Sequence, residues 1–335
     1  MKEFVKLDES LFKTEKCITK YPEPVLTYKD VPYRSALVFN AAALKLENNK
    51  YVMIFRNDVG DYDKKTLDYY VTNLGIAYSD DGINWEVAPE PVWEMHTDEI
   101  YRIYDPRLTY LEGRFYLCFA MDTKHGVRGG IAVSDDLKKF EIISLSTPDN
   151  RNMVLFPEKI DGKYVRLERP MPVYSFGYDK FDIWLSKSPD LVHWGESELV
   201  LGTEHVPYSN DKIGPAAPPI KTDKGWLTIF HSVDTDLSRG KNGWEETWKK
   251  RYSVGIMLLD LNDPTKVIGM SKKPLIVPET YWETKEGYRT NVLFPCAMIL
   301  EDDNMVKIYC SASDTVVCLA TAKLEDLLAL CTEEK

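Results

Sequence analysis

The sequence predicts an all-β protein that folds as a five-bladed β-propeller with short helices at its two ends. Two repeats carry this prediction. The first is a polar turn that begins with Ser and ends on Trp or Phe, and its copies occupy residues 79–85, 134–140 and 188–194. The copies start roughly 55 residues apart, a period typical of four-stranded propeller blades. Each copy is expected to join two strands, with its aromatic residue packed between blades.

The second repeat consists of apolar segments, each preceded by a turn rich in Asn, Asp, Glu and Gly. The segments are 51–56, 115–120, 164–169, 226–231 and 306–311. An Asx-Gly pair between apolar runs is typical of a β-hairpin, so each segment is expected to follow a hairpin turn within a blade. Five copies in 335 residues predict five blades of roughly 65 residues each. An unrelated β-sandwich would not be expected to keep both repeats in phase.

The whole chain, residues 1–335, is expected to form one domain. Residues 1 to about 30 would be an N-terminal extension with a short helix at 9–17. Residues from about 323 to 335 would hold a closing helix, whose apolar pattern covers 324–331.

Residues 234–251 break the repeat. They are polar, contain Trp244 and Trp248, and predict a loop or short helix inserted after the second strand of the fourth blade. Insertions in repeat folds commonly lie on the binding face, so we expect a functional role for this one.

Charge and cysteine content limit the possible partners and compartment. The formal net charge is −11 at pH 7, whereas nucleic acids and anionic membranes select basic surfaces, so neither is expected as a partner. The cysteines lack paired spacing, which predicts free thiols in a reducing compartment and no zinc site. No signal-peptide pattern and no long apolar stretch occur. We therefore expect a cytoplasmic protein.

The second repeat also places cations at one register. The segments end on Arg56, Ala120, Arg169, His231 and Ser311. Arginine is rarely buried without a partner, so this register predicts an anion at the centre of the propeller. The alternative is that each arginine pairs with a nearby acid such as Glu168 or Asp149.

Polar residues also precede the strands expected to line the central channel. The segments that carry them are 39–43, 104–107, 150–152, 212–215 and 291–295. They add Arg151 and Lys212 to the cations, which would surround Asp58, Asp105 and Asp314. An oxyanion would relieve this excess of positive charge, and the arginine fork suits phosphate geometry.

Asp105 is the candidate catalytic acid. It precedes Pro106 at the start of an apolar strand, and the proline removes a backbone donor and fixes the chain direction. An Asp-Pro pair is also a common turn, so the position of Asp105 in the repeat is the stronger argument.

Taken together and in order, these segments resemble glycoside hydrolase family 130, the mannoside phosphorylases built on a five-bladed β-propeller. The resemblance runs from about residue 40 to residue 322. It is carried by residues 38–40, 55–58, 104–107, 150–152, 156–159, 168–170, 212–214, 251–255, 258–261, 291–295 and 311–315, and by His231.

The resemblance implies inverting, reversible phosphorolysis of a terminal β-mannoside, with release of α-D-mannose 1-phosphate. An inverting hydrolase needs two carboxyl groups, whereas a phosphorylase needs only the acid, because phosphate is already a nucleophile. Asp105 would be the general acid, thought in the family to deliver its proton through the 3-hydroxyl of the cleaved mannose. By the same resemblance, phosphate would be bound by Arg151, Arg169, His231 and Tyr252, and the mannosyl ring by Asn40, Arg56, Asp58, Lys212 and Asp314.

Two features refine the resemblance. Many relatives carry Gly-Ala-Ala-Asp where residues 311–314 read Ser-Ala-Ser-Asp, and the aspartate is kept. Residues 287–290 are less usual and are expected to contact the acceptor. The chain length resembles that of the shorter subgroup, which acts on β-1,4-mannooligosaccharides, and we expect that activity.

Several alternatives stay open. The substrate could be mannosyl-N-acetylglucosamine, mannosyl-glucose or a β-1,2-mannoside. The enzyme could instead be an inverting β-mannosidase. A non-enzymatic sugar-binding propeller would use an aromatic rim formed by Tyr69, Tyr70, Trp93, Trp244 and Trp248. We expect no metal and no cofactor besides phosphate as co-substrate, small-molecule mannooligosaccharide as partner, and a homo-oligomer.

Overall fold

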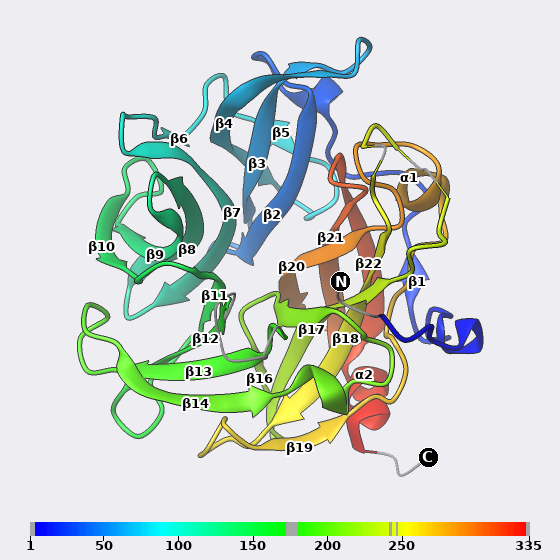
Figure 1. The fold of residues 1–335 in the computed structure, drawn as a ribbon. Helices are drawn as coiled ribbons and strands as arrows, with labels where there is room; N and C mark the ends of the chain where they lie inside the picture. Colours follow the sequence, from blue (N-terminus) through cyan, green and yellow to red (C-terminus); the bar gives the residue numbers. More distant parts are fainter. Residues whose placement is uncertain (1–3, 172–179, 241–242, 246, 333–335) are drawn as a thin grey trace.

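The computed structural model describes residues 4–171, 180–240, 243–245 and 247–332, with Tyr70 described by its backbone alone. It contains five antiparallel sheets. They follow one another in sequence order around a central axis, from blue through green to red (Figure 1). The prediction of an all-β, five-bladed propeller is confirmed.

The first strand of blades 1 to 4, and β20 of blade 5, lie next to the axis (Figure 1). Blade 1 consists of β2 (Leu37–Lys45), β3 (Tyr51–Asp61), β4 (Thr66–Ser79), β5 (Glu86–Val87) and β6 (Trp93–Glu94). Blade 2 consists of β7 (Ile100–Leu111), β8 (Arg114–Thr123), β9 (Gly126–Ser134) and β10 (Glu141–Leu145). Blade 3 consists of β11 (Asn150–Leu155), β12 (Tyr164–Pro170), β13 (Ile183–Ser188) and β14 (Gly195–Leu201). Blade 4 consists of β15 (Lys212–Pro215), β16 (Ile220–Lys221), β17 (Trp226–Thr235), β18 (Lys250–Leu259) and β19 (Val267–Met270). Blade 5 consists of β20 (Leu293–Leu300), β21 (Met305–Ala312), β22 (Val316–Lys323) and β1 (Thr19–Lys20).

The ring closes through the N-terminal part of the chain. Strand β1 pairs antiparallel with β22, and the backbone N–H groups of Tyr21 and Val25 donate to carbonyls of the same strand. The extension predicted for residues 1–30 therefore supplies the outermost strand of the last blade. Such pairing joins an N-terminal and a C-terminal strand in one sheet and covers an edge that would otherwise be open.

The second repeat forms the middle strands β3, β8, β12, β17 and β21, as expected. Its turns are tight hairpins. At residues 112–113 the φ angles are +49° for Glu112 and +81° for Gly113, and at 161–162 they are +49° for Asp161 and +73° for Gly162. Two consecutive positive φ angles are the signature of the hairpin turn whose twist matches the flanking strands.

The first repeat forms polar turns that place an aromatic ring between blades. In its first copy, Ser79 Oγ accepts from the N–H of Gly82 at 2.9 Å, and Asp81 Oδ1 accepts from two following N–H groups. The ring of Trp85 meets Tyr309 of blade 5, with centroids 6.0 Å apart. Phe140 stacks on Trp93 of blade 1 at 5.6 Å, and Trp194 packs into a cluster that includes strands of blade 2. The predicted role of this repeat is confirmed.

The helices were predicted less well. The C-terminal helix is present as α2 (Leu324–Thr332). The helix expected at 9–17 is wrong, because only the 3₁₀ turn η1 (Glu9–Leu11) forms. Beyond it the N–H of Glu15 donates to the carbonyl of Leu275, so this backbone bonds to the segment that follows blade 4. A short helix α1 (Tyr281–Thr284) and the 3₁₀ turns η2 (Tyr28–Asp30) and η3 (Thr203–His205) were not expected.

All six cysteines are free. Burial raises the pKa of the Cys118 and Cys296 thiols to about 12, which keeps both groups in the unreactive thiol form. Among the described residues, no helix has the length and apolar character that crossing a bilayer requires.

Candidate active site

The cationic register predicted from the second repeat is present. Arg56, Ala120, Arg169, His231 and Ser311 each pair with an innermost strand, opposite Phe39, Tyr104, Arg151, Gly214 and Phe294 in that order. Five positions far apart in the sequence therefore share one level of the propeller.

A backbone bulge follows this level in the first three blades. The ladder shifts register between Phe39 and Ala42, and likewise after Tyr104 and after Arg151. The residues at the shift are Asn40, Asp105 and Asn152, with φ angles of +48°, +55° and +58°. Asn and Asp tolerate this left-handed conformation better than other residues with a Cβ. Because a bulge re-aims a side chain, a polar group enters the centre where the strand would otherwise bury an apolar one.

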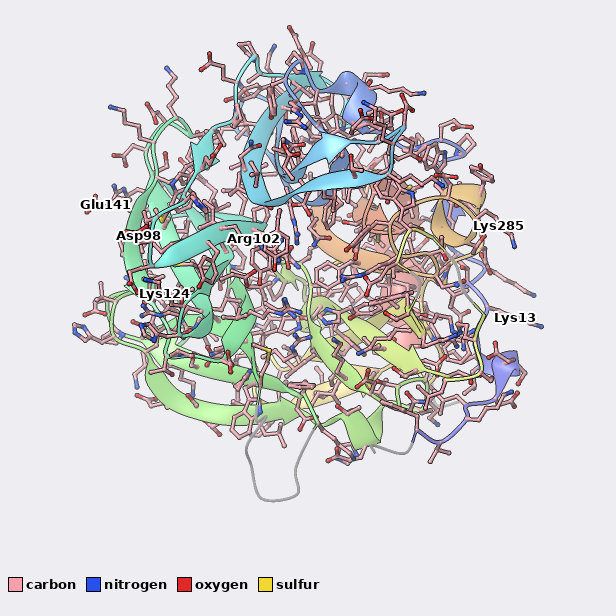
Figure 2. The ribbon with its side chains drawn as sticks, turned by 45° about the horizontal axis from the view of Figure 1, so that its top comes forward. Lys13, Asp98, Arg102, Lys124, Glu141 and Lys285 are labelled. Carbon is pink, nitrogen blue, oxygen red and sulfur yellow. The ribbon has the colours of Figure 1, made fainter. Side chains whose placement is uncertain are left out.

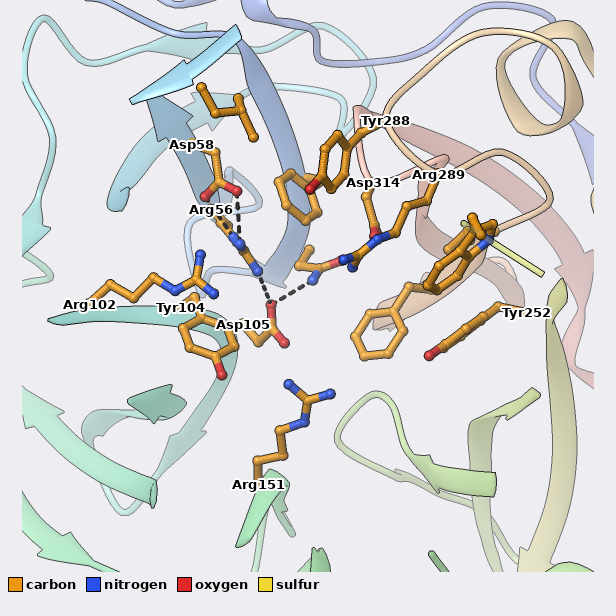
Figure 3. A pocket seen from close by; sticks show the side chains of 16 residues that line it. Arg56, Asp58, Arg102, Tyr104, Asp105, Arg151, Tyr252, Tyr288, Arg289 and Asp314 are labelled. Atoms are coloured by element: carbon orange, nitrogen blue, oxygen red, sulfur yellow. Dashed lines mark hydrogen bonds and ion pairs between the residues drawn. The ribbon is translucent and has the colours of Figure 1, made fainter. Parts of the chain in front are cut away.

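A pocket opens at this level on the axis (Figure 3). Of the predicted site residues, it brings together Asn40, Arg56, Asp58, Asp105, Arg151, Tyr252 and Asp314. Arg169 and His231 are buried, 2% and 0% exposed, and adjoin the pocket, since the His231 ring lies 4.7 Å from that of the lining residue Phe294 and is bonded to Arg169. Lys212 lies beside Tyr252, with Nζ 5.6 Å from the ring centroid. All ten predicted residues thus belong to one region.

Asp105 is oriented by four neighbours. Its Oδ1 accepts from Asn40 Nδ2 at 2.5 Å and from Arg56 Nη1 at 3.4 Å. Ser311 Oγ donates to Asn40 Oδ1 at 2.7 Å, which turns the amide nitrogen toward Asp105. Arg107 Nη1 donates to the carbonyls of Asp105 and Pro106 and so fixes the bulge. Oδ2 has no hydrogen-bond partner in the described part of the chain and faces the open pocket (Figure 3).

Arg56 and Asp58 form one wall of the pocket. Two parallel hydrogen bonds of 2.8 Å join the guanidinium to the carboxylate. Thr72 donates to the same carboxylate at 2.8 Å. The Arg56 guanidinium also lies 4.5 Å from the ring of Phe39 and 4.9 Å from that of Tyr104. This wall is rigid and electrically balanced.

The opposite side is cationic and unbalanced. Arg169 Nη1 donates to His231 Nε2 at 3.1 Å. Neither Arg151 nor Arg169 forms an ion pair with a described carboxylate. Glu168 pairs instead with Arg166 at 2.8 Å, and Asp149 accepts from the backbone of Val127. The alternative in which neighbouring acids neutralise the arginines therefore holds for Arg56, which pairs with Asp58, and is wrong for Arg151 and Arg169.

Several buried polar atoms on this side have no protein partner among the described residues. They are the donors Arg151 Nε, Arg169 Nε, His231 Nδ1 and Asn152 Nδ2, and the acceptor Asn152 Oδ1. Buried polar groups are nearly always hydrogen-bonded, so this concentration of mostly donor atoms points to a ligand rich in acceptors. Asn152 was not singled out from the sequence, although its place after Arg151 matches that of Asp105 after Tyr104.

Burial and mutual repulsion perturb the charges of this side. Burial, together with Arg169, Lys212 and Arg107, lowers the pKa of His231 well below its usual range, so the ring is neutral. Because its Nε2 accepts from Arg169, the proton lies on Nδ1. Burial and the neighbouring Arg169 also lower the pKa of Lys212 well below its usual value. Burial, followed by Arg151, lowers that of Arg169. An anion would relieve all three effects.

Comparison with known proteins identifies the family of this chain. The family model described as β-1,4-mannooligosaccharide phosphorylase, glycoside hydrolase family 130, matches residues 13–333. The chain belongs to glycoside hydrolase family 130. It is 34% identical to a 1,2-β-oligomannan phosphorylase of Thermoanaerobacter sp. (strain X514), over 91% of this chain and 96% of the relative. It is 32% identical to a β-1,4-mannooligosaccharide phosphorylase of Ruminococcus albus, over 91% of this chain and 88% of the relative.

Solved structures of the family share the fold. The complex of a β-1,2-mannobiose phosphorylase from Listeria innocua with β-1,2-mannobiose superposes with a TM-score of 0.79 at 25% identity, covering 95% of this chain and 99% of that one. The predicted family is thereby confirmed, and the chain is an enzyme of a phosphorylase family.

This family-130 pocket is also lined by residues outside the ten predicted site residues. They are Phe39, Leu67, Arg102, Tyr104, Trp248, Tyr288, Arg289, Val292 and Phe294. Arg102 lies close to the axis, whereas Lys13, Lys124 and Lys285 lie at the periphery (Figure 2). Arg102 Nε and the Tyr104 hydroxyl both donate to Asp122, at 2.7 and 2.6 Å. Of residues 287–290, expected on the acceptor side, Tyr288 and Arg289 line the pocket.

Blade 5 does not repeat the polar position of the first three blades, because Pro295 follows Phe294 where Asn40 follows Phe39. The aromatic rim is wrong as a set, because Trp93 is packed between Phe119 and Phe140. Tyr69 is 82% exposed, and the side chain of Tyr70 lies outside the described residues.

The lack of a side chain at Gly214 makes room for the His231 ring. A substitution at Gly214 therefore tests the role of His231. A Cβ built on Gly214 would lie 2.4 Å from His231 Cε1 and 3.0 Å from Asn152 Nδ2. We expect Gly214→Ala to displace the imidazole, to lower the free energy of unfolding by about 1–3 kcal/mol and to abolish thermal stabilisation by inorganic phosphate. Gly195→Ala is the matched control, since nothing lies within 4 Å of its Cβ. Normal phosphate stabilisation of Gly214→Ala would contradict this assignment.

Proposed function

We propose that this protein is an inverting mannoside phosphorylase that transfers a terminal β-mannosyl residue to inorganic phosphate and releases α-D-mannose 1-phosphate. The observation that carries the proposal is the group of unpartnered buried donors on Arg151, Arg169 and His231, with no described carboxylate paired to them. Of these residues, Arg151 points toward Asp105 across the pocket (Figure 3). Phosphate offers the acceptor oxygens and the negative charge that these groups need.

The proposed step follows from the two sides of the pocket. A phosphate oxygen held by Arg151, Arg169, His231 and Tyr252 attacks the anomeric carbon, and the bond from that carbon to the leaving oxygen breaks. Asp105 gives its proton to the leaving oxygen, directly or through the 3-hydroxyl of the mannose. The acidic proton of the bound phosphate then replaces the one that Asp105 gave. Protons therefore balance without a second catalytic group.

The sugar would lie against the balanced wall. We assign the mannosyl ring to Asn40, Arg56, Asp58 and Asp314, whose hydrogen-bonding groups line the pocket around Asp105. Lys212 was expected to join this group. Its neighbours are Tyr252, Arg169 and Arg151, so we now assign it to the phosphate side.

Hydrolysis is the less favoured alternative. An inverting hydrolase needs a carboxylate base to activate water on the face opposite the acid. The carboxylate beside Lys212 is Asp211, which is engaged by Lys250 at 2.8 Å and by Thr235 at 2.9 Å. A base there would also have to act among several cations, which hold a carboxylate ionised but weaken it as a base.

The linkage stays a prediction. We propose that the substrates are β-1,4-mannooligosaccharides. The rival substrates are β-1,2-mannosides, because relatives of similar identity are named for each of the two linkages. A cytoplasmic location and a homo-oligomeric state also stay predictions.

Phosphate dependence tests the proposal. Purified protein should cleave β-1,4- or β-1,2-mannobiose only when inorganic phosphate is added, and mannose 1-phosphate should accumulate in equimolar amount with mannose. The reverse reaction, from mannose 1-phosphate and a panel of acceptors, should identify the linkage. Cleavage at full rate in phosphate-free buffer, with mannose as the only product, would favour the hydrolase.

A further inference from the structure

Asp314 lies at the end of a chain of contacts that starts in another blade. It sits in the turn between β21 and β22, where Ser313 and Asp314 have φ angles of +53° and +51°. This left-handed conformation is unfavourable for two successive residues with side chains. The surroundings must therefore hold the turn in place.

The first layer of these surroundings is the connector, residues 285–292, which joins α1 to β20. The N–H of Arg289 donates to the carbonyl of Ser313, and that of Tyr288 donates to Thr315 Oγ1 at 2.8 Å. Gly287 makes the close approach possible, because a Cβ there would lie 2.6 Å from that of Ser313. The connector thus packs backbone to backbone against the turn.

The second layer is the inserted segment, residues 236–249, of which 241, 242 and 246 lie outside the described residues. The N–H groups of Trp244 and Glu245 donate to the carbonyl of Tyr288 at 3.0 and 3.1 Å. Gly243, with a φ of +77°, again allows close approach, since its Cβ would lie 2.7 Å from the carbonyl oxygen of Gly287. The insertion in blade 4 is therefore layered on the connector, and the connector on the turn of Asp314.

One side chain crosses these layers. The guanidinium of Arg289 lies 4.8 Å from the ring of Trp248 and 5.0 Å from that of Tyr288. Its Nε donates to Glu245, and its Nη1 lies 3.4 Å from Asp314 Oδ2. Figure 3 shows Arg289 reaching Asp314 along the pocket wall. A planar cation held by two rings and two carboxylates is fixed in direction as well as position.

Asp314 needs such a partner because its surroundings oppose its charge. Burial raises its pKa, and Arg289 and Arg56 oppose this rise, while Asp105 adds to it. The other titratable groups within its reach are Tyr252 and the Cys296 thiol. Arg56 is already engaged by Asp58 and Asp105. Arg289 is therefore the cation most directly committed to Asp314.

We propose that Arg289, anchored by Glu245 of the inserted segment, is a positioning residue that keeps Asp314 ionised and aimed into the pocket, so that the insertion in blade 4 sets the affinity for the mannosyl donor. The inference rests on the proposed function. It gives a role to the insertion, which contains none of the residues proposed to bind the mannosyl ring.

The test compares Arg289→Met, Arg289→Lys, Glu245→Gln and the control Glu286→Gln. Glu286 lies in the same connector and accepts from Tyr62 at 2.8 Å, so its change to glutamine matches the loss of charge in Glu245→Gln. The KM values for phosphate and for whichever mannobiose the wild type cleaves are measured across pH, with thermal unfolding to check the fold.

For Arg289→Met we expect the donor KM to rise about tenfold, as loss of one charge-assisted hydrogen bond implies. The phosphate KM should change less than about threefold. Without the cation the pKa of Asp314 rises further, so the acid limb of kcat/KM for the donor should move to higher pH. Arg289→Lys should return the acid limb to its wild-type pH. Glu245→Gln should raise the donor KM about threefold, and Glu286→Gln should behave as wild type.

Equal changes in both KM values, or an unmoved acid limb in a folded Arg289→Met protein, would overturn the inference. If Arg289→Met does not fold, the test is the comparison of Glu245→Gln with Glu286→Gln. Identical donor KM values for these two variants would overturn the inference. A wild type that cleaves no mannobiose with phosphate would instead overturn the proposed function.

Discussion

Replacing Asp105 by Asn should lower the rate of phosphorolysis by about 10²–10⁴-fold, the usual contribution of a positioned general acid. The substitution is conservative in structure. Position 105 has a φ of +55°, which Asn accepts readily, and an amide oxygen can still accept from Asn40 and Arg56. The loss is therefore expected in kcat, with the thermal unfolding temperature within a few degrees of wild type.

A good leaving group separates acid catalysis from a structural effect. An aryl β-mannoside whose phenol has a low pKa needs little protonation as it departs, so Asp105→Asn should lose far less activity on it than on mannobiose. Equal losses on both substrates, or a variant that keeps more than about a hundredth of the mannobiose rate, would show that Asp105 is not the acid.

The charge around Asp105 adds a pH signature. Burial raises its pKa, but Arg56, Arg151 and Arg107 outweigh burial and lower it, so the free enzyme carries a carboxylate at neutral pH. Bound phosphate would offset Arg151 and raise the pKa of Asp105, which lets it carry a proton. The alkaline limb of kcat, which reports the complex, should therefore lie at higher pH than that of kcat/KM for phosphate.

The fold was readable from the sequence where local and global preferences agree. The middle strands and the turns before them were found because polar turn residues and apolar runs coincide in each blade. The helix expected at residues 9–17 does not form, because its backbone bonds to Leu275, in the segment after blade 4, a contact that no local pattern encodes. The helix α1 did carry a local signal, since Thr280 and Glu283 form a capping box.

The centre of the site was more predictable than its mouth. Arg56, Arg169 and His231 share a register that the repeat reveals, so topology alone brings them together. Arg102 lies near the start of β7, whereas Trp248 and Arg289 come from the insertion and the connector, which have no counterpart in the other blades. The meeting of Trp248 and Arg289 depends on close backbone approaches at Gly243 and Gly287. Such approaches are tertiary facts that a single sequence does not display.

Arg169→Ala should raise the KM for phosphate by roughly 10- to 100-fold, since one or two charge-assisted hydrogen bonds are lost. The KM for the mannosyl donor should change less than about threefold. Arg169 lies beneath the cationic side, bonded to His231, whereas the proposed sugar wall is anchored by the separate pair of Arg56 and Asp58.

The stability of the same variant provides an independent readout. In the free protein Arg169 is buried close to other cations, so removing its charge relieves repulsion. Arg169→Met, which keeps the apolar stem, should unfold at or above the wild-type temperature without phosphate. Its unfolding temperature should rise little when phosphate is added, because a ligand stabilises a protein only as far as it binds.

Arg56→Ala should show the reverse kinetic pattern, with the larger change in the donor KM. If Arg169→Ala raised both KM values equally, or if Arg169→Met kept the full phosphate-induced rise in unfolding temperature, phosphate would have to bind elsewhere.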